Sequence, residues 1–498
     1  MWDQLLYGLS VAGQPANLLY CFIGCFYGTA VGVLPGFGPA AAIALLLPIT
    51  FGMKPASAII MFAGIYYGAM FGGSTTSILV NIPGEAASVV TTFDGYQMAR
   101  QGRAGSALGI SAIGSFVAGT LAVVGLCLVS PLVANFALQF GPPEFFSLMI
   151  LGLAIVIFIS FGSVIKGVMM GLLGIILGAV GWDVILGQPR ITFGIEYLAD
   201  GIPVIPVVMG LFGISEVFIN LEKTQKMEVF KDIKNILPSL KELRESTWPI
   251  LRGTGVGFFL GLLPIAGTVV APFAAYTIEK KISRNPEKFG KGAIAGVAAP
   301  ESANNAAAQA GFIPLLTLGI PVSAVYALVL AGFLIHGVHP GPLLLTNSPD
   351  VFWGVIMSMY IGNIFLLILN LPLIRMWIKV LEIPYSLLFP LILIFCLIGS
   401  LEGNRSGTTL VMIIFGILGY LMRKFEYEPA PMIIAFIISP ILEMNFRQSL
   451  IISNGNFNIF FTKPISAVCL AAMGALFLLV GLYNFKAKVQ NRRKQTIA

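Results

Sequence analysis

Charged residues are scarce in this chain of 498 residues. Only 10% of them are Asp, Glu, Lys or Arg, whereas 57% are hydrophobic, and the mean hydropathy is +0.91. A soluble domain carries about 25% charged residues, and no soluble fold could cover this much apolar side chain. The composition therefore excludes a soluble protein and predicts an integral membrane protein.

Motifs for phosphate, metal or nucleic-acid chemistry are missing as well. No G-x-x-x-x-G-K-[ST] loop is present, so this chain is not expected to hydrolyse ATP. Its five cysteines lie in apolar segments away from its two histidines, so we expect neither a metal centre nor a cofactor. The net charge of +7 comes from basic residues gathered in a few loops and the tail. That pattern indicates membrane topology, and no nucleic-acid partner is expected.

Uncharged runs long enough to span a bilayer recur along the whole sequence. A membrane helix needs roughly 20 such residues, and long runs cover 4–53, 55–84, 104–143, 253–278, 302–349, 351–374 and 464–485. No Lys or Arg precedes Lys54, so we expect the first span to be retained and not cleaved as a signal. We predict an all-α polytopic protein of a bacterial plasma membrane, with about ten to fourteen embedded helices, some broken or re-entrant.

One charged excursion divides the chain nearly in half. We expect a first membrane half at 1–220, a cytoplasmic linker at 221–252, a second membrane half at 253–485 and a basic cytoplasmic tail at 486–498. Apolar residues from Val229 to Leu237 fall at helical spacing opposite Lys231 and Lys234, which indicates an amphipathic interfacial helix. A plain solvated linker fits the same residues equally well.

The two halves share a pair of motifs in the same order. GVLPGFGP at 32–39 resembles GLLPIAGT at 261–268 with an offset of 229 residues. Gly73, Ile82 and Pro83 align with Gly311, Ile320 and Pro321 with an offset of 238. Internal duplication of this kind is common in secondary transporters, although chance similarity between Gly/Pro-rich apolar segments is the alternative.

Basic residues predict that the two copies have opposite orientations. In the first copy only Lys54 lies between the motifs, and Arg100 and Arg103 follow the second motif. In the second copy five basic residues lie between the motifs at 280–292, and none lies at 339–350. Because cytoplasmic loops are rich in Lys and Arg, we predict two inverted-topology repeats. The N-terminus is then outside, and loops 92–106, 221–252 and 280–292 and the tail are inside.

Proline and glycine inside these motifs indicate broken helices, because both weaken helix continuity. Irregular backbone survives in a membrane only where protein or a water-filled cavity satisfies it. Helix N-termini at such breaks favour an anion, and free carbonyl groups can coordinate Na⁺. The breaks therefore predict carboxylate uptake coupled to a cation.

Polar and flexible residues around the breaks are the candidate site for substrate or cation. Hydroxyl and amide groups can bind a carboxylate or complete a Na⁺ shell, although the sequence does not identify the Na⁺ ligands. The alternative is that these side chains pack between membrane helices. We expect packing for Thr317. The candidates are Gly36, Gly38, Ser74, Thr75, Thr76, Asn81, Pro83, Gly84, Gly267, Glu301, Ser302, Asn304, Asn305, Gly319 and Pro321.

Two carboxylates stand in otherwise neutral stretches, Glu85 and Glu301. Intramembrane carboxylates are functional candidates by default, and either could bind a coupling Na⁺ or proton. A helix cap or a solvated carboxylate is the alternative, which we favour for Glu85.

Three stretches of this sequence closely resemble the large membrane subunit of the tripartite tricarboxylate transporter family. They are GVLPGFGPAAAIALLLPITF, APESANNAAAQAGFIPLLTLGIP and the long GSTTSILVNIPGEAASVVTTFDGYQMARQGRAGSALGISAIGSF. The resemblance covers nearly the whole chain. One departure is Val322, which follows the GIP motif where the family pattern leads us to expect Gly.

The resemblance implies a secondary carrier for citrate or related di- and tricarboxylates, usually driven by Na⁺ or H⁺. It also implies two partners, a small four-helix membrane subunit and a periplasmic solute-binding protein. Another organic anion such as an aromatic acid is the alternative substrate. A channel or a membrane-embedded enzyme is disfavoured, because the duplicated breaks are typical of carriers and no nucleophile–base constellation is present.

Overall fold

Six helices in the described part of the chain are long and apolar enough to cross a membrane. They are Pro15–Val33, Pro55–Val80, Ala104–Ala137, Val204–Glu222, Pro349–Asn370 and Pro429–Ile452. Shorter apolar helices accompany them at Pro142–Phe158, Val164–Gly178, Ala324–Ile335 and Pro464–Leu478. The prediction of a polytopic helical membrane protein is confirmed. The predicted ten to fourteen embedded segments counted half-helices as well as full spans, so they are compared with the long and the short apolar helices together.

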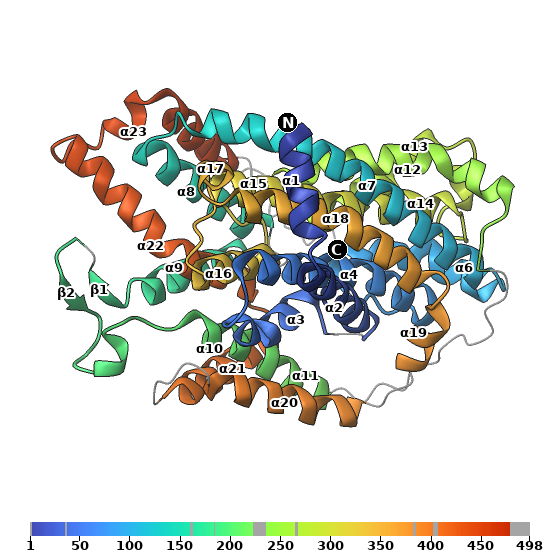
Figure 1. Cartoon of the computed structure of the whole chain (residues 1–498), viewed down its shortest axis with the longest axis horizontal. Helices are drawn as coiled ribbons and strands as arrows, with labels where there is room; N and C mark the ends of the chain where they lie inside the picture. Colours follow the sequence, from blue (N-terminus) through green and yellow to red (C-terminus); the bar gives the residue numbers. More distant parts are fainter. Residues whose placement is uncertain are drawn as a thin grey trace, which may run out of the picture.

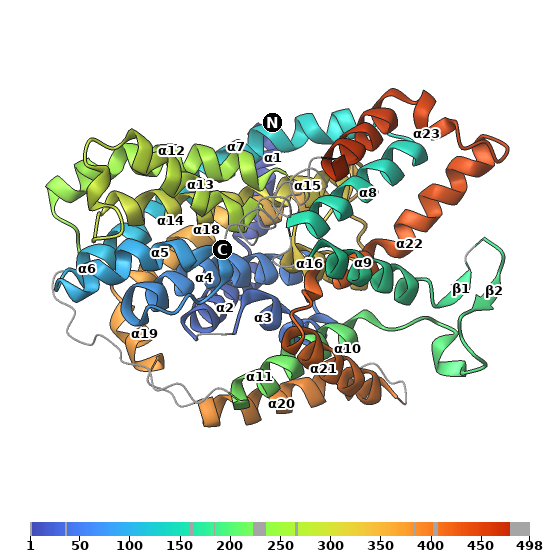
Figure 2. The same ribbon diagram turned by 180° about the vertical axis from the view of Figure 1, so that it is seen from behind.

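The computed structural model describes residues 2–34, 37–159, 163–183, 185–222, 236–263, 267–381, 385–401 and 407–478. Figures 1 and 2 show helices lying mostly along the long axis of the molecule. The first half contains α1 (Trp2–Ala12), α2 (Pro15–Val33), α3 (Pro39–Leu46), η1 (Pro48–Thr50), α4 (Pro55–Val80), η2 (Ala86–Ser88), α5 (Val89–Thr91), η3 (Thr92–Tyr96), α6 (Gln97–Arg100), α7 (Ala104–Ala137), α8 (Pro142–Ile159), α9 (Val164–Gly178), β1 (Gly181–Asp183), β2 (Gln188–Arg190), η4 (Glu196–Leu198), α10 (Val204–Val208), η5 (Met209–Ile214) and α11 (Ser215–Glu222).

The second half begins with α12 (Leu240–Gly261), whose first residue falls within the range expected for the linker. The expected amphipathic segment from Val229 and the tail 486–498 lie largely or wholly outside the described residues. The remaining elements are α13 (Gly267–Ile282), η6 (Pro286–Lys288), α14 (Ala295–Ala310), α15 (Phe312–Leu318), α16 (Ala324–Ile335), α17 (Leu344–Asn347), α18 (Pro349–Asn370), α19 (Ile374–Val380), α20 (Tyr385–Leu401), α21 (Thr408–Lys424), α22 (Pro429–Ile452) and α23 (Ile459–Thr462).

Glycines let one pair of helices in each half pack backbone to backbone. Glycine at every fourth position puts three glycines on one face of a helix, and small residues there allow close approach. A Cβ placed on any of them would overlap the facing backbone of the partner helix. On α2 and α4 the facing pairs are Gly24/Met61, Gly28/Ile65 and Gly32/Ala69; on α12 and α14 they are Gly253/Ala299, Gly257/Ala303 and Gly261/Ala307. The glycines are offset by 229 residues and their partners by 238, which are the offsets of the two sequence motifs.

The two helix pairs run in opposite directions. Ser74, late in α4, donates a hydrogen bond to Glu301, early in α14. Tyr66 lies two turns before Ser74 in α4, and its ring is 5.1 Å from the ring of Tyr326. The Tyr326 hydroxyl donates at 2.6 Å to the carbonyl of Ala308, which lies two turns after Glu301 in α14. The register between α4 and α14 is therefore antiparallel, whereas α2 with α4 and α12 with α14 are parallel.

Three loops meet at one end of the molecule, which we call the basic end. Gln101 donates to the carbonyl of Lys291 at 2.8 Å, and Arg103 donates to the carbonyl of Gly292 at 3.3 Å and pairs with Glu242 at 2.8 Å. Although burial opposes it, the Arg103 guanidinium and the Ser239 groups lower the pKa of Glu242 to about 2. The loops that were predicted to share one membrane side, 92–106, 221–252 and 280–292, thus contact one another through their described residues.

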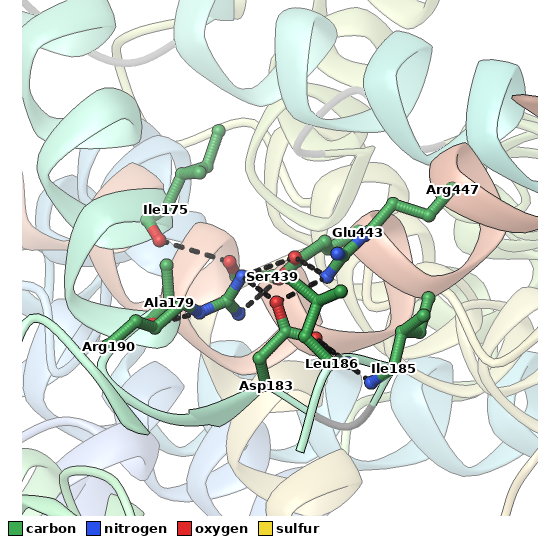
Figure 3. A network of polar contacts seen from close by, with 9 residues as sticks. All are labelled: Ile175, Ala179, Asp183, Ile185, Leu186, Arg190, Ser439, Glu443 and Arg447. Carbon is green, nitrogen blue, oxygen red and sulfur yellow. Dashed lines mark hydrogen bonds and ion pairs between the residues drawn. The ribbon is translucent and has the colours of Figure 1, made fainter. Parts of the chain in front are cut away.

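A short antiparallel hairpin marks the opposite end, which we call the hairpin end. Strands β1 and β2 form it and Figure 1 shows it at the left edge, away from α6 and the α13–α14 connection. Arg190 donates to both carboxylate oxygens of Glu443 at 2.5 Å, and Arg447 donates to Asp183 at 2.7 Å (Figure 3). The Arg447 hydrogen bond lowers the pKa of Asp183 to about 2, so this carboxylate stays charged. The hairpin was not predicted, and its ion pairs fix it to α22.

Opposite ends of the molecule should be accessible from opposite sides of a membrane. Ser283 follows α13 beside the basic end, whereas Ser348 precedes α18, a helix of 22 residues. At roughly 1.5 Å per residue, α18 is about 33 Å long, and Leu371 after its C-terminus lies beside Ser106 and Glu242 of the basic end. We therefore expect Ser283→Cys and Ser348→Cys to react with an impermeant thiol reagent from opposite faces of oriented vesicles. The five native cysteines are buried and should give little background; labelling of both variants from one face would contradict the arrangement.

The glycine contacts predict unequal effects of two neighbouring substitutions in α12. A Cβ on Gly257 would collide with the backbone of Ala303, whereas a Cβ on Gly255 has no neighbour within 4 Å. Gly257→Ala should force the helices apart and lower the free energy of unfolding by about 1–3 kcal/mol. Gly255→Ala is the matched control and should be neutral or stabilising by up to about 1 kcal/mol. Thermal unfolding of the purified variants measures both, and equal midpoints would show that the pair is not closely packed.

Candidate functional site

In both copies of the second motif, a helix ends in the same unusual way before the Ile-Pro pair. α4 ends at Asn81 (φ 60°, ψ 26°) and α15 ends at Gly319 (φ 69°, ψ 23°), both left-handed caps. Asn and Gly tolerate this conformation, and a proline two residues later, Pro83 or Pro321, cannot continue the helix. The chain then becomes extended at Glu85 and Ser323, which are the N-caps of η2 and α16. Each pair of equivalent residues is 238 positions apart, so the second motif forms the same break twice.

The segments that follow the breaks surround one cavity of about 470 Å³. Its wall contains Gly38–Ala41 at the start of α3, Thr268 and Val269 at the start of α13, Val322–Val325 at the start of α16, and Gly84–Ala87. Three helix N-termini from the two halves thus converge on the cavity. Free N–H groups and the positive end of the helix dipole favour an anion at such positions.

Four charged side chains line this cavity. Arg423 is the one basic residue among the described lining residues, and it forms an ion pair with Glu216. Glu85 and Glu428 add two further carboxyl groups. With all four groups ionised, the lining is more negative than positive, so an anionic substrate requires compensating positive charge from helix N-termini or from cations.

Glu85 caps the short helix after the first break. Its carboxylate accepts a hydrogen bond from Ser88 at 2.9 Å, and the Ser88 hydroxyl lies 3.4 Å from the Glu85 backbone N–H. The Nδ2 group of Asn304 donates to the Glu85 carboxylate from α14 at 3.2 Å. The helix-cap alternative therefore describes the contacts of Glu85, although its carboxylate also faces the cavity.

Glu301 lies outside the cavity, in a buried cluster of hydroxyl groups. Its side chain is fully buried, and its carboxylate accepts hydrogen bonds from Ser74 of α4, Thr91 of α5 and Ser111 of α7, the last at 3.1 Å. One turn further along α14, Asn305 donates to the carbonyl of Glu301 at 3.1 Å and to Ser115 at 2.7 Å. This cluster joins α14 of the second half to α4, α5 and α7 of the first half.

The candidate residues therefore divide between two places. Gly38 and Gly84 line the cavity, Gly267 begins α13 beside it, and Asn81, Pro83, Gly319 and Pro321 form the breaks. Ser74 and Asn305 contact Glu301 or its neighbours, while Thr75 is close by in α4. The Thr76 hydroxyl donates to the carbonyl of Gly73, and the Ser302 hydroxyl is buried with no hydrogen-bond partner in the described part of the chain. Gly36 lies outside the described residues.

No motif or pattern in the sequence pointed to Arg423, Glu216 or Glu428. They lie on α21, on α11 and just before α22, outside the repeated motifs. Asp94 was also missed, because it lies between the nearby charges Glu85 and Arg100 and does not stand out in the sequence. Its buried carboxylate accepts from the N–H groups of Gly290, Gly292 and Ala293 at 2.7–3.0 Å and from the Tyr276 hydroxyl at 2.9 Å. Asp94 thereby holds the segment before α14 against the first half.

An array of helices long enough to span a membrane, around a cavity that holds charged side chains, is typical of a membrane transport protein. The match to the family model "Tripartite tricarboxylate transporter TctA family" covers residues 18–434. The chain therefore belongs to this family, the large transmembrane subunits of tripartite tricarboxylate transporters, and it is a transporter component and not an enzyme.

Two relatives from Agrobacterium vitis share about half of their residues with this chain. The "Uncharacterized 52.8 kDa protein in TAR-I ttuC' 3'region" is 49% identical over 488 residues, which is 98% of this chain and 97% of the relative. The "Uncharacterized protein in TAR-II ttuC' 3'region" is 50% identical over 227 residues, which is 45% of this chain and 93% of the relative. No solved structure matches.

Proposed function

We propose that this chain is the permease subunit of a binding-protein-dependent secondary carrier that imports citrate or related di- and tricarboxylates. The observation that carries the proposal is the cavity of about 470 Å³, where helix N-termini from both halves meet Arg423. Such a volume lies within the usual range of small-molecule sites. The cavity thus combines an adequate size with groups that favour a carboxylate.

Arg423 is the proposed partner of a substrate carboxylate. A guanidinium binds carboxylates through two parallel hydrogen bonds. Arg423 pairs with Glu216, so a substrate carboxylate must compete with this contact. Substrate binding then becomes easier when a cation or a proton neutralises Glu216 or the nearby carboxylates Glu85 and Glu428. This dependence supports coupling to Na⁺ or H⁺.

Inverted repeats and alternating access are part of the proposal. The matched glycine contacts, the two left-handed caps and the antiparallel register of α4 and α14 support a duplicated, inverted architecture. In carriers of this type, the two repeats move relative to each other around a site at their interface. The cavity has the required position, because its wall contains post-break segments of both halves.

The basic end is the proposed cytoplasmic end. It carries Arg103 and the five basic residues of 280–292, and cytoplasmic loops are enriched in such residues. Helix α1 packs through Gly8 against Trp353, near the start of α18. The N-terminus is then outside and the basic tail inside.

Two partners follow from the family, a small four-helix membrane subunit and a periplasmic solute-binding protein. With the basic end in the cytoplasm, the hairpin end faces the periplasm, where a binding protein would deliver substrate. Capture of a dilute solute is then the task of that protein.

An aromatic acid is the second candidate substrate. Tyr66, Met70 and Phe212 line the cavity alongside Arg423, so an aromatic ring could pack against apolar side chains while its carboxylate meets the guanidinium. A tricarboxylate would leave these side chains in contact with polar groups.

Substitution of Arg423 should weaken substrate binding selectively. Losing a hydrogen bond to a charged group costs roughly 1.5–3 kcal/mol, which is about a ten- to hundredfold loss in affinity. We expect this loss for Arg423→Gln in equilibrium binding of radiolabelled citrate and aromatic acids to the purified chain. Lys424→Gln is the matched control, because Lys424 is exposed and pairs with Glu222, and its affinity should be unchanged.

A double variant separates binding from folding in this experiment. Arg423→Gln alone leaves the buried Glu216 without its ion pair, whereas Arg423→Gln with Glu216→Gln removes both charges. The double variant should remain weak in binding even where its thermal stability is restored. Wild-type affinity in either variant would contradict the assignment of Arg423.

Transport should depend on the partners. Reconstituted alone in proteoliposomes, the chain should show little uptake of substrate at low concentration, and adding the small subunit and the binding protein should restore it. Arg423→Gln with both partners present serves as the inactive control. Efficient high-affinity uptake by the chain alone would argue against a tripartite system.

A further inference from the structure

A second, much smaller void lies beside Glu301 and apart from the substrate cavity. Its volume is about 10 Å³, and its polar lining consists of Ser74 and Thr75 of α4, Ser111 of α7 and Asn370 at the end of α18. A space of this size holds about one water-sized body. Ser74 and Ser111 are also two of the three hydroxyl partners of Glu301.

Two features favour a positively charged occupant, one in the wall of the void and one in Glu301, which bonds to the wall residues Ser74 and Ser111. The Oδ1 atom of Asn370 is buried and has no hydrogen-bond partner among the residues that the structure describes, while its Nδ2 group donates to the carbonyl of Leu366 at 2.9 Å. Glu301 is fully buried, and its contacts within the described residues come from hydroxyl groups, without a basic side chain. Buried carboxylates are normally paired with a positive charge or bound to a metal ion.

We infer that this void is a Na⁺ site, with oxygen ligands from Ser74, Thr75, Ser111 and Asn370 and with Glu301 supplying the balancing charge. Hard cations prefer such oxygen ligands, and a single carboxylate suits a monovalent ion better than Ca²⁺, which takes several charged ligands. A proton on Glu301 would neutralise the carboxylate but would leave the Asn370 oxygen without a donor. The inference rests on the proposed function, for which it identifies the coupling ion.

Contacts lead from this site to the substrate cavity. Asn304 lies one turn beyond Glu301 on α14 and donates to Glu85, which lines the cavity after the first break. Thr91, another partner of Glu301, lies in the helix that follows Glu85 and η2. An ion beside Ser74 and Ser111 would therefore hold α4, α7 and α18 around Glu301 and stabilise the segment that carries Glu85.

The test is thermal unfolding of the purified full chain without any carboxylate substrate. NaCl is exchanged for choline chloride or KCl at constant ionic strength, because an ion that binds only the folded state raises the midpoint. We expect a Na⁺-specific rise in the wild type. Asn370→Ala and Ser111→Ala should raise the apparent Kd for Na⁺ about tenfold or more, and Glu301→Gln should abolish the response.

Thr317→Ala is the matched hydroxyl control, since its hydroxyl bonds only the carbonyl of Ile313 within its own helix at 2.7 Å, and it should respond like the wild type. Direct binding of ²²Na⁺ to variants that elute as folded protein keeps the test valid where a variant is less stable. An unchanged midpoint in the wild type, a full response in Glu301→Gln, or stabilisation that follows pH and not Na⁺ would overturn the inference.

Failure of this inference is separable from failure of the proposed function. If citrate binds and Arg423→Gln weakens it while Na⁺ has no effect, the void is not the coupling site. If Na⁺ stabilises the chain through Glu301 while no carboxylate binds, the Na⁺ site stands and the substrate assignment fails.

Discussion

The close backbone contact between α2 and α4, and between α12 and α14, is the constraint on which the site depends. Each helix pair approaches without side chains between its glycines and the facing backbone. The contact continues to the breaks, since a Cβ on Gly84 would collide with the backbone of Gly32 and Gly73. The end of α2 and the break after α4 therefore meet, and the segment after the break that ends α15 lies at the same cavity. Lipid provides no hydrophobic force between helices, so packing of this kind has to hold them.

Charge is the second constraint, because the charged groups of the proposed substrate site and of the proposed ion site lie in two separate places. The cavity holds Arg423 together with Glu85, Glu216 and Glu428, while Glu301 lies in a separate buried cluster. An anion that entered this environment alone would be opposed by the carboxylates, because interactions between charges are strong where water is scarce. Binding of cations would reduce that opposition, which is the physical reason for the proposed coupling of carboxylate uptake to an ion gradient.

Much of the framework could be predicted from the sequence, because membrane helices and their breaks leave local signals. Apolar runs indicated the spans, and proline and glycine indicated the breaks at Pro83 and Pro321. The polar run at Ser74–Thr76 was expected to bind substrate or cation. Within α4, Ser74 reaches Glu301, and Ser74 and Thr75 line the small void. Arg423 and Asp94 carry no local signal, since their roles arise from contacts with Glu216 and with the segment 290–293 across the fold. The hairpin at 181–190 likewise depends on distant partners, Glu443 and Arg447.

Reciprocal binding of substrate and ion tests the central claim most directly. If the carboxylate and Na⁺ offset each other's charge within one protein, each must raise the affinity of the other by the same factor. Titration calorimetry of the purified chain with citrate, at several Na⁺ concentrations and constant ionic strength, measures one direction, and titration with Na⁺ at several citrate concentrations measures the other. The account predicts tighter citrate binding as Na⁺ increases and an equal effect of citrate on Na⁺. Citrate binding that is independent of Na⁺ would contradict it.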